Sequence, residues 1–385
     1  MATTHEQLTE WAIAHRRYLH QHPELSGQEF ETCRYIRHEL TKLGIELLDY
    51  QAPSTVGFIP GTIGEKTILL RADIDALPIH EEGEEKPYIS KVPGVAHACG
   101  HDGHTSILLA VARWMTENRE HVKHNIKLVF QSSEELAPSG AEQLVKEGVL
   151  EEVDVVFGLH LMSSLPKGQI GVCPGPMMAS SDDFEITIYG KGGHGASPHE
   201  TIDPTIVAAH LILGIQSIIS RQMDPMEAGI VSIGTLRAGS NYNIIPNEVE
   251  ITGTFRAFTM ETRHLIKEKL EHLTHSISAT FGATAKMDII AGGTPPVVND
   301  AAVTNQVTKR LVQHITSHEV VPFEKVMLAE DFSFYLQQKQ GSYFVVGMGG
   351  ENSAYPHHHP KFDIDEEEIG TAIQAFLAIA KHYEF

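Results

Sequence analysis

Hydrophobic and polar positions in the first 160 residues follow two alternating patterns. Apolar side chains recur at helical spacing in three segments, which predicts helices at 4–21, 28–43 and 101–118. Short, nearly continuous apolar runs lie between the helical segments, and they predict strands buried on both faces at 67–71, 125–130 and 153–157. Strands that alternate with helices predict an α/β domain with a mixed, mostly parallel sheet and flanking helices.

The pattern changes near Ser180, where apolar and polar residues begin to alternate as in half-exposed strands. The expected order is strand 183–189, helix 204–220, strand 230–236, strand 248–256, helix 261–281 and strand 285–290. This β-α-β-β-α-β order is the split, ferredoxin-like α+β arrangement. A helix after Asn299, a strand at 342–346 and a closing helix from Glu366 then resume the first pattern. We therefore predict one domain of residues 1–181 and 293–385, with residues 182–292 inserted as a second.

Each of the three early strands leads into a side chain suited to catalysis or metal binding. Asp75 follows the first, Glu134 and Glu135 follow the second, and His160 follows the third. Ligands bind at the carboxyl edge of an open α/β sheet because the strand ends converge there. Asp75 alone is also explained as a turn former, and the two glutamates as a solvated charge pair. Their shared position favours one site.

The run from His97 to His104 holds three histidines, Cys99 and Asp102 on a short turn with two glycines. Sulfur and nitrogen donors separated by one residue suit first-row metal ions, and glycine lets the backbone fold tightly around them. A histidine-rich surface loop is the other interpretation. Together with the acids and His160, the run supplies donors for two divalent ions. Zn²⁺ or Mn²⁺ is expected, and the donor set also admits Co²⁺ or Ni²⁺.

Composition narrows the partners and the compartment. The 385 residues exceed the usual size of a single core, which agrees with two domains. The net charge of −21 argues against nucleic acid and membrane surfaces as partners and favours a small-molecule substrate. Three cysteines, no apolar signal core and no later run near the ~18 apolar residues of a membrane span predict a cytoplasmic protein.

Nine short motifs, in order over essentially the whole chain, resemble a known family. They are RADIDALP, HACGHDGHT, EE after a strand, FGLH, GKGGHGASPH, NIIP, GTFRA, EDFS and HHPKFD. The resemblance is to the amidohydrolase branch of the aminoacylase and glutamate-carboxypeptidase metallopeptidase family. That branch includes hippurate hydrolases, N-acyl-amino-acid deacylases, N-acetyl-diaminopimelate deacetylases and auxin-conjugate hydrolases. It implies a two-metal site in the larger domain, and a lid domain that binds substrate and forms a homodimer contact.

Position by position, the resemblance implies a set of metal ligands. Cys99 stands where much of the wider family has a metal-bridging aspartate. His101 and His160 would complete one metal, while Glu135 and a histidine near residue 358 would complete the other. Asp75 resembles the acid that orients a liganding imidazole.

Three consecutive histidines leave the last ligand open. Related sequences place it two residues before Pro360, which selects His358. His359 is the second choice, and His357 the third.

The remaining roles also come from the resemblance and from the chemistry of amide hydrolysis. Glu134 is the expected general base, because alternation along a strand would turn it away from Glu135. In the lid, His194 resembles a histidine that stabilises the tetrahedral oxyanion, and Asn243 a polar contact near it. Arg256 would hold the substrate carboxylate through its planar guanidinium.

The function that follows is metal-dependent hydrolysis of an N-acyl amino acid, N-acetyl or aromatic acyl, to a carboxylate and a free amino acid. Two metal ions lower the pKa of a water toward ~7 and polarise the scissile carbonyl. A dipeptidase or exopeptidase on the same scaffold is the nearest alternative. A non-catalytic metal-binding or ligand-sensing protein is the other, and Glu134 argues against it because a pure binding site needs no additional acid.

Overall fold

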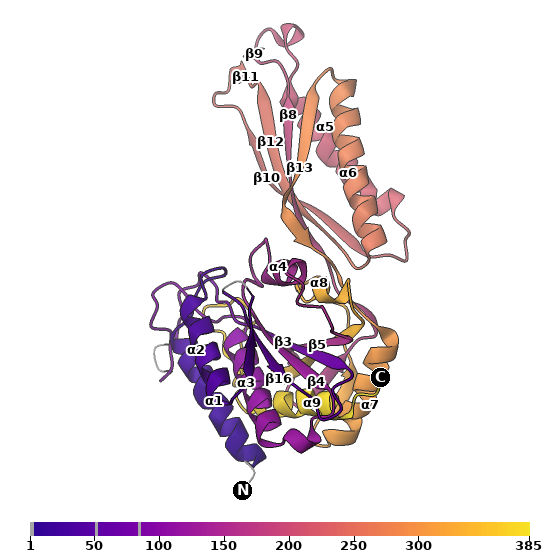
Figure 1. Ribbon diagram of the computed structural model, residues 1–385. Coiled ribbons are helices and arrows are strands. Elements are labelled where there is room, and N and C mark those ends of the chain that lie inside the picture. Colours follow the sequence, from indigo (N-terminus) through magenta and orange to yellow (C-terminus); the bar gives the residue numbers. More distant parts are fainter. Residues whose placement is uncertain (1–3, 51–52, 84–85) are drawn as a thin grey trace. The chain divides into compact units, whose positions relative to one another are not determined.

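The computed structural model describes residues 4–50, 53–83 and 86–385 (Figure 1). The chain divides into two compact units. The larger unit comprises Met1–Gly175, Asn299–Glu324 and Asp331–Phe385, and the inserted unit comprises Pro176–Val298 and Lys325–Glu330. The expected insertion of residues 182–292 lies within the second unit. Residues 176–181, 293–298 and 325–330 were expected in the first domain, but they belong to the inserted unit. There the N–H of Ala179 donates to the carbonyl of Leu328, and that of Val326 donates to the carbonyl of Met177.

The larger unit has an eight-stranded sheet with helices packed against it. Its helices are α1 (His5–Gln21), α2 (Phe30–Lys42), α3 (His101–Glu117), α4 (Gly140–Lys146), α7 (Ala301–His314), α8 (Ser333–Leu336) and α9 (Glu368–His382). Its strands are β1 (Glu46–Leu48), β2 (Thr55–Ile59), β3 (Thr67–Asp73), β4 (Asn125–Gln131), β5 (Val155–Pro166), β6 (Gln169–Val172), β15 (Glu319–Pro322) and β16 (Gly341–Gly349). The strand order is β1-β2-β4-β3-β5-β16-β6-β15.

The centre of this sheet, β4-β3-β5-β16, is parallel, and antiparallel pairs flank it. The mixed, mostly parallel sheet predicted from the sequence is therefore confirmed. Ile68, Leu70 and Ala72 of β3 alternate into one large core with residues of α1, α2, α3, α7 and α9. Figure 1 shows α1, α3 and α9 together along one side of this sheet.

Strand β5 differs from its prediction. The apolar run ends at Phe157, but the strand continues to Pro166 because its backbone pairs with β16 over that length. His160 consequently lies inside the strand and is held by the sheet itself, whereas Glu134 and Glu135 follow the end of β4.

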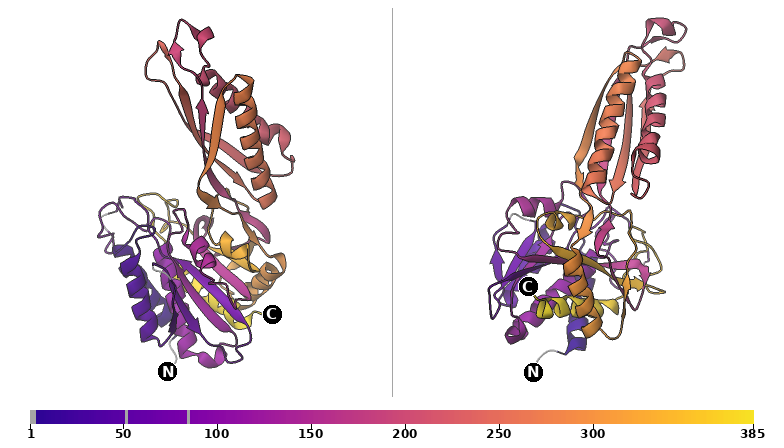
Figure 2. Two further views of the ribbon diagram at one scale, coloured as in Figure 1. Left: turned by 45° about the horizontal axis from the view of Figure 1, so that its top comes forward. Right: turned by 90° about the vertical axis from the view of Figure 1, so that its right-hand side faces the viewer.

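The inserted unit is a two-layer α+β domain. Its elements are β8 (Ser181–Tyr189), β9 (Gly193–His194), α5 (Pro204–Ser217), β10 (Gly229–Ala238), β11 (Ile244–Ile245), β12 (Glu248–Ala257), α6 (Met260–Thr280) and β13 (Thr284–Thr294). The antiparallel sheet order is β10-β12-β8-β13, which with two helices is the expected ferredoxin-like arrangement. Figure 2 shows the two helices side by side on one face of that sheet. A ribbon of β7 (Gly175–Met178) and β14 (Val297–Asn299) lies at the ends of the insertion.

Helix α5 begins a long apolar segment. With the π-helical turn that follows it, Pro204–Gln222 is long and apolar enough, by length and composition alone, to cross a membrane. One such helix is only weak evidence for a membrane span, because core helices of soluble proteins pass the same test of length and composition. Val207, Leu211 and Ile215 pack into the core of the inserted unit, so one face of this helix already has its partner.

Candidate metal centre

Separate elements of the larger unit bring the five expected ligands together. Cys99 precedes α3, His101 begins it, Glu135 follows β4, His160 lies in β5, and His358 lies between β16 and α9. The Cys99 sulfur is 3.6 Å from Nε2 of His160, and Nε2 of His358 is 3.0 Å from Oε1 of Glu135. Ligand atoms of Cys99, Glu135 and His358 lie within 4.8 Å of one another. The Cys99 sulfur therefore belongs to two groups of possible donors, one with His160 and the other with Glu135 and His358.

His101 has the hydrogen bonding expected of a metal ligand. Its Nδ1 lies 3.0 Å from the Asp75 carboxylate and 3.0 Å from the Asp75 carbonyl, both of which accept from an N–H. Among the described residues, its buried Nε2 has no hydrogen-bond partner. A proton fixed on Nδ1 leaves the Nε2 lone pair for a cation. The contact with Asp75 is the one that an orienting acid makes.

Electrostatics at this site favour a bound cation. Burial and the negative charge of Glu135 raise the pKa of the Cys99 thiol well above its usual value. Burial lowers the pKa of His160, and the nearby His104 and His357 lower it further. A thiolate close to a carboxylate is unfavourable in a buried site unless a positive charge compensates it. The donor set fits a divalent metal, which would supply that charge.

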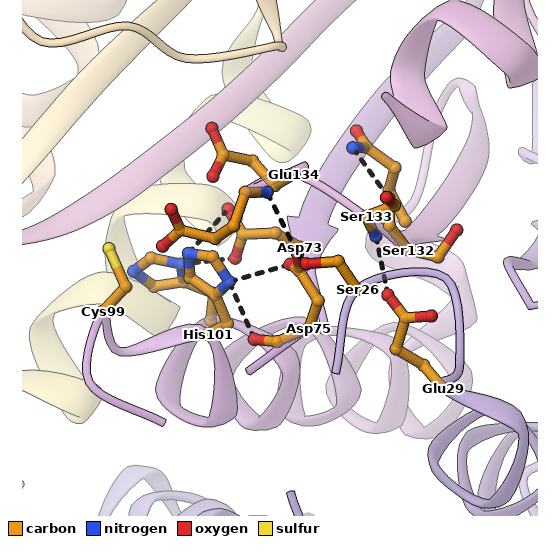
Figure 3. A network of polar contacts seen from close by, with 12 residues as sticks. Ser26, Glu29, Asp73, Asp75, Cys99, His101, Ser132, Ser133 and Glu134 are labelled. Atoms are coloured by element: carbon orange, nitrogen blue, oxygen red, sulfur yellow. Dashed lines mark hydrogen bonds and ion pairs between the residues drawn. The ribbon is translucent and has the colours of Figure 1, made fainter. Parts of the chain in front are cut away.

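Glu134 does not point where strand alternation predicts. Strand β4 ends at Gln131, and Ser133 has a left-handed backbone with φ +53°, so the rule of alternation no longer applies. Carboxylate oxygens of Glu134 and Glu135 lie within 4.8 Å of each other and of a His101 ring nitrogen. Figure 3 shows the Glu134 side chain extending to the side of the turn where Cys99 and His101 lie. The expected base and the expected ligand thus reach the same place.

The three consecutive histidines separate into different environments. His358, which the spacing from Pro360 selects as the expected ligand, reaches Glu135. His357, the third choice, lies with Cys99 and His160, and its Nδ1 is 3.9 Å from the Cys99 sulfur. His359, the second choice, is turned away: its Nδ1 accepts from the N–H of Lys361 and its ring stacks on Tyr355. Of these two histidines, the structure therefore places His357, and not His359, among the possible donors.

A buried polar network lies next to the site. The Arg71 guanidinium is 1% exposed and donates to Gln131 (2.9 Å), Asp73 (2.6 Å) and Asp331 (2.5 Å). Asp73 in turn accepts from His104 at 2.6 Å. Because the other ring nitrogen of His104 accepts from the N–H of Leu161, both nitrogens are engaged within the protein.

Replacing Arg71 with methionine should strongly destabilise the protein. The change leaves Asp73 and Asp331 as buried charges without their cation, which typically costs about 3–5 kcal/mol. Chemical denaturation of the Arg71→Met variant should show this fall in the free energy of unfolding. Arg34→Met is the control, because Arg34 pairs with Glu31 on the surface and such pairs contribute little. Equal stability of the two variants would contradict the network's role.

In the sequence, Asp331 stands out only as part of the EDFS motif. Its side chain binds Arg71 and Gln131, and its backbone N–H donates to Oε1 of Glu134 at 3.4 Å. The motif signalled an important residue. Its link to the acid emerges only from the fold, since 197 residues separate the two.

The three expected lid residues all lie in the inserted unit. His194 is exposed in β9, its Nδ1 accepts from the N–H of Ala196, and its backbone pairs with β11. Asn243 adjoins β11, and its carbonyl accepts from the N–H of Gly195. Arg256, expected to hold a substrate carboxylate, lies in β12 and donates to the carbonyl of Met327 at 3.2 Å. The β9–β11 ladder thus places His194 and Asn243 close together, whereas Arg256 lies in the separate four-stranded sheet.

Comparisons with known proteins agree with this site. The family model described as peptidase family M20/M25/M40 matches residues 69–382. Thermostable carboxypeptidase 1 of Saccharolobus solfataricus is 40% identical over 380 residues, 97% of this chain and 96% of the relative. N-acetylcysteine deacetylase of Bacillus subtilis is 40% identical over 367 residues, 95% and 94% of the two chains. A solved dinuclear metal binding peptidase of Bacillus subtilis is 36% identical, with a TM-score of 0.85 over 98% of each chain.

These similarities extend over nearly the whole chain and through both units. The resemblance found in the sequence motifs is confirmed, and so is the predicted enzyme class, a metal-dependent amidohydrolase. The chain belongs to peptidase family M20/M25/M40.

Proposed function

We propose that this enzyme hydrolyses N-acyl amino acids, with an N-acetyl or aromatic acyl group, to a carboxylate and a free amino acid. The observation that carries the proposal is the meeting of two ligand groups at Cys99 beside Glu134. The 40% identity to an N-acetylcysteine deacetylase supports an N-acyl amino acid as substrate.

Two divalent metal ions are part of this proposal. Cys99, His101 and His160 would hold one, and Cys99, Glu135 and His358 the other. Zn²⁺ or Mn²⁺ fits the mixed sulfur, nitrogen and oxygen donors, and Co²⁺ or Ni²⁺ is compatible with them. When bound, such ions lower the pKa of a water and polarise the amide carbonyl.

The protein's own residues would move the protons and bind the substrate. Glu134 takes a proton from the attacking water and later passes it to the departing nitrogen, so that the amine leaves as a neutral group. Asp75 would keep the proton of His101 on Nδ1 and so leave Nε2 free to hold a metal ion. In the inserted unit, His194 and Asn243 would stabilise the oxyanion, and Arg256 would bind the substrate carboxylate after exchanging the Met327 carbonyl for it.

A dipeptidase or exopeptidase activity is the second candidate, and the similarity to a thermostable carboxypeptidase favours considering it. N-acetyl and N-benzoyl amino acids should be assayed beside dipeptides, on protein loaded with Zn²⁺ or Mn²⁺. We expect kcat/KM to be at least about tenfold higher for the best N-acyl amino acid, a difference of ~1.4 kcal/mol in transition-state binding. Faster dipeptide cleavage would support the exopeptidase, and no cleavage by metal-loaded protein would support a binding role.

We also propose a homodimer formed through the inserted unit, in a cytoplasmic protein. Ile206 and Leu213 on the outer side of α5 are 51% and 72% exposed, and Leu236 on the edge strand β10 is 50% exposed. Apolar side chains next to an unpaired strand edge are suited to contact with a second copy. Light scattering should give the mass of two chains, and the mass of one would contradict the dimer.

A further inference from the structure

We propose that Glu29 is a positioning residue, which holds the turn Ser133–Glu135 so that the carboxylates of Glu134 and Glu135 converge. The inference rests on the proposed function in one respect, namely that Glu134 is the base and Glu135 a ligand. Glu29 itself lies on a separate segment, immediately before α2, and the sequence motifs assigned it no role.

The turn after β4 needs external support. Ser133 has φ +53°, a region that costs a residue with a side chain about 1–2 kcal/mol. This turn takes Glu134 and Glu135 out of strand alternation and lets both reach His101. If Ser133 relaxed to an extended backbone, the two carboxylates would again point to opposite sides. The left-handed residue is therefore the condition for a base and a ligand at one place.

Glu29 contacts that residue directly. Its Oε1 accepts a hydrogen bond of 2.7 Å from the N–H of Ser133, and its side chain is fully buried (Figure 3). On the far side of the turn, the N–H of Glu135 donates to Asp75 at 3.0 Å. The two peptide N–H groups that flank Glu134 are thus each held by a carboxylate. One of these acids was expected from the motifs, and Glu29 is the other.

The segment that carries Glu29 is itself fixed to the site. Ser26 donates to the Asp75 carboxylate at 2.7 Å, and the N–H of Ala76 donates to the carbonyl of Glu24 at 2.9 Å. Both contacts join the loop between α1 and α2 to the segment after β3. Glu29 therefore supports the turn from a structure that already contacts the acid behind His101.

The protonation of Glu29 indicates which property of the side chain matters. Burial and the nearby charge of Asp75 raise the pKa of Glu29 to about 7, while the Ser133 N–H opposes this shift. Asp75, Ser133 and the thiol of Cys33 are the groups that face it from the neighbouring elements. Because the neutral and charged forms are close in energy near pH 7, the acceptor oxygen matters more than the charge. Glutamine, which keeps that oxygen, should substitute for it.

Glu29→Ala should lower kcat for the N-acyl substrate at least about tenfold, the scale on which supporting residues act, while KM stays nearly unchanged. Metal content should fall as well, because Glu135 moves with the turn. Glu29→Gln should recover most of that loss. Glu24→Ala is the matched control, because the Glu24 carboxylate accepts from the N–H groups of Glu31 and Thr32 in α2 and does not hold the turn. Loss of kcat in Glu24→Ala equal to that in Glu29→Ala would overturn the inference.

Hydrogen exchange tests the same contact without any need for activity. The amides of residues 133–135 should exchange at least about tenfold faster in Glu29→Ala than in the parent or in Glu24→Ala, because the open turn exposes them. Unchanged exchange would overturn the inference, as would faster exchange with an unchanged kcat. If Glu29→Ala does not fold, Glu29→Asp provides the test, since the shorter aspartate side chain cannot reach the N–H of Ser133. The kcat of Glu29→Asp must then be lower than that of Glu29→Gln. An inactive parent protein would refute the proposed function alone.

Discussion

Replacing Glu134 with glutamine is expected to lower kcat by about 10²–10⁴-fold while both metal ions stay bound, the usual scale for loss of a general base. The amide has nearly the shape of the acid and still accepts from the N–H of Asp331, but it cannot take a proton from water. Glu134→Ala should behave in the same way. Steady-state kinetics together with elemental analysis of the purified variant measure both parts of this prediction.

The neighbouring residue provides the control for Glu134. Glu135→Gln should lose metal as well as activity, because Glu135 lies with Cys99 and His358 in one donor group. Glu134→Gln and Glu135→Gln would then both be inactive, but only Glu134→Gln would keep its metal ions. Full activity of Glu134→Gln, or loss of both ions from it, would show that Glu134 is not the base.

Cys99→Ala should remove more metal than any other single substitution in the site. Both proposed groups of donor atoms contain the Cys99 sulfur, so its loss lowers the affinity for both ions at once. Loss of His358 or His160 lowers the affinity for one ion. Metal content should fall from about two ions per chain to below one. Substitutions of residues that hydrogen-bond to a metal ligand typically lower activity ~10–100-fold, and the loss of activity in Cys99→Ala should be larger than that.

A second buried thiol serves as the control for Cys99. Cys33 is 4% exposed, and burial raises its pKa to about 12, so it is an inert thiol inside the core. Cys33→Ala should keep both ions and its activity, at some cost in stability. Equal metal loss from the two variants would show that the effect comes from general destabilisation.

Periodicity predicted most of the fold, and the motifs indicated side chains that the structure brings close together. Continuous apolar runs identified β3 and β4 because buried parallel strands require such residues, and the split pattern of the inserted unit appeared from its alternation. The motifs placed Cys99, His101, Glu135, His160 and His358 in one site, and the structure brings these five side chains into overlapping donor groups.

What the sequence could not predict depends on backbone conformation and on contacts between distant segments. The direction of Glu134 depends on one left-handed serine, and the length of β5 depends on pairing with β16. The positions of His357 and His359 follow from the path of their loop, which includes a left-handed His358. Glu29 and Asp331 reach the turn after β4 from distant parts of the chain. None of these effects has a periodic signature.

The most direct test of the two-metal site is anomalous diffraction from crystals grown with Zn²⁺ or Mn²⁺. We predict two peaks about 3.5–4 Å apart, the usual spacing in two-metal enzymes, with the Cys99 sulfur contacting both. One peak should also contact His160, and the other Glu135 and His358. A single peak, or peaks that Cys99 does not contact, would contradict the account.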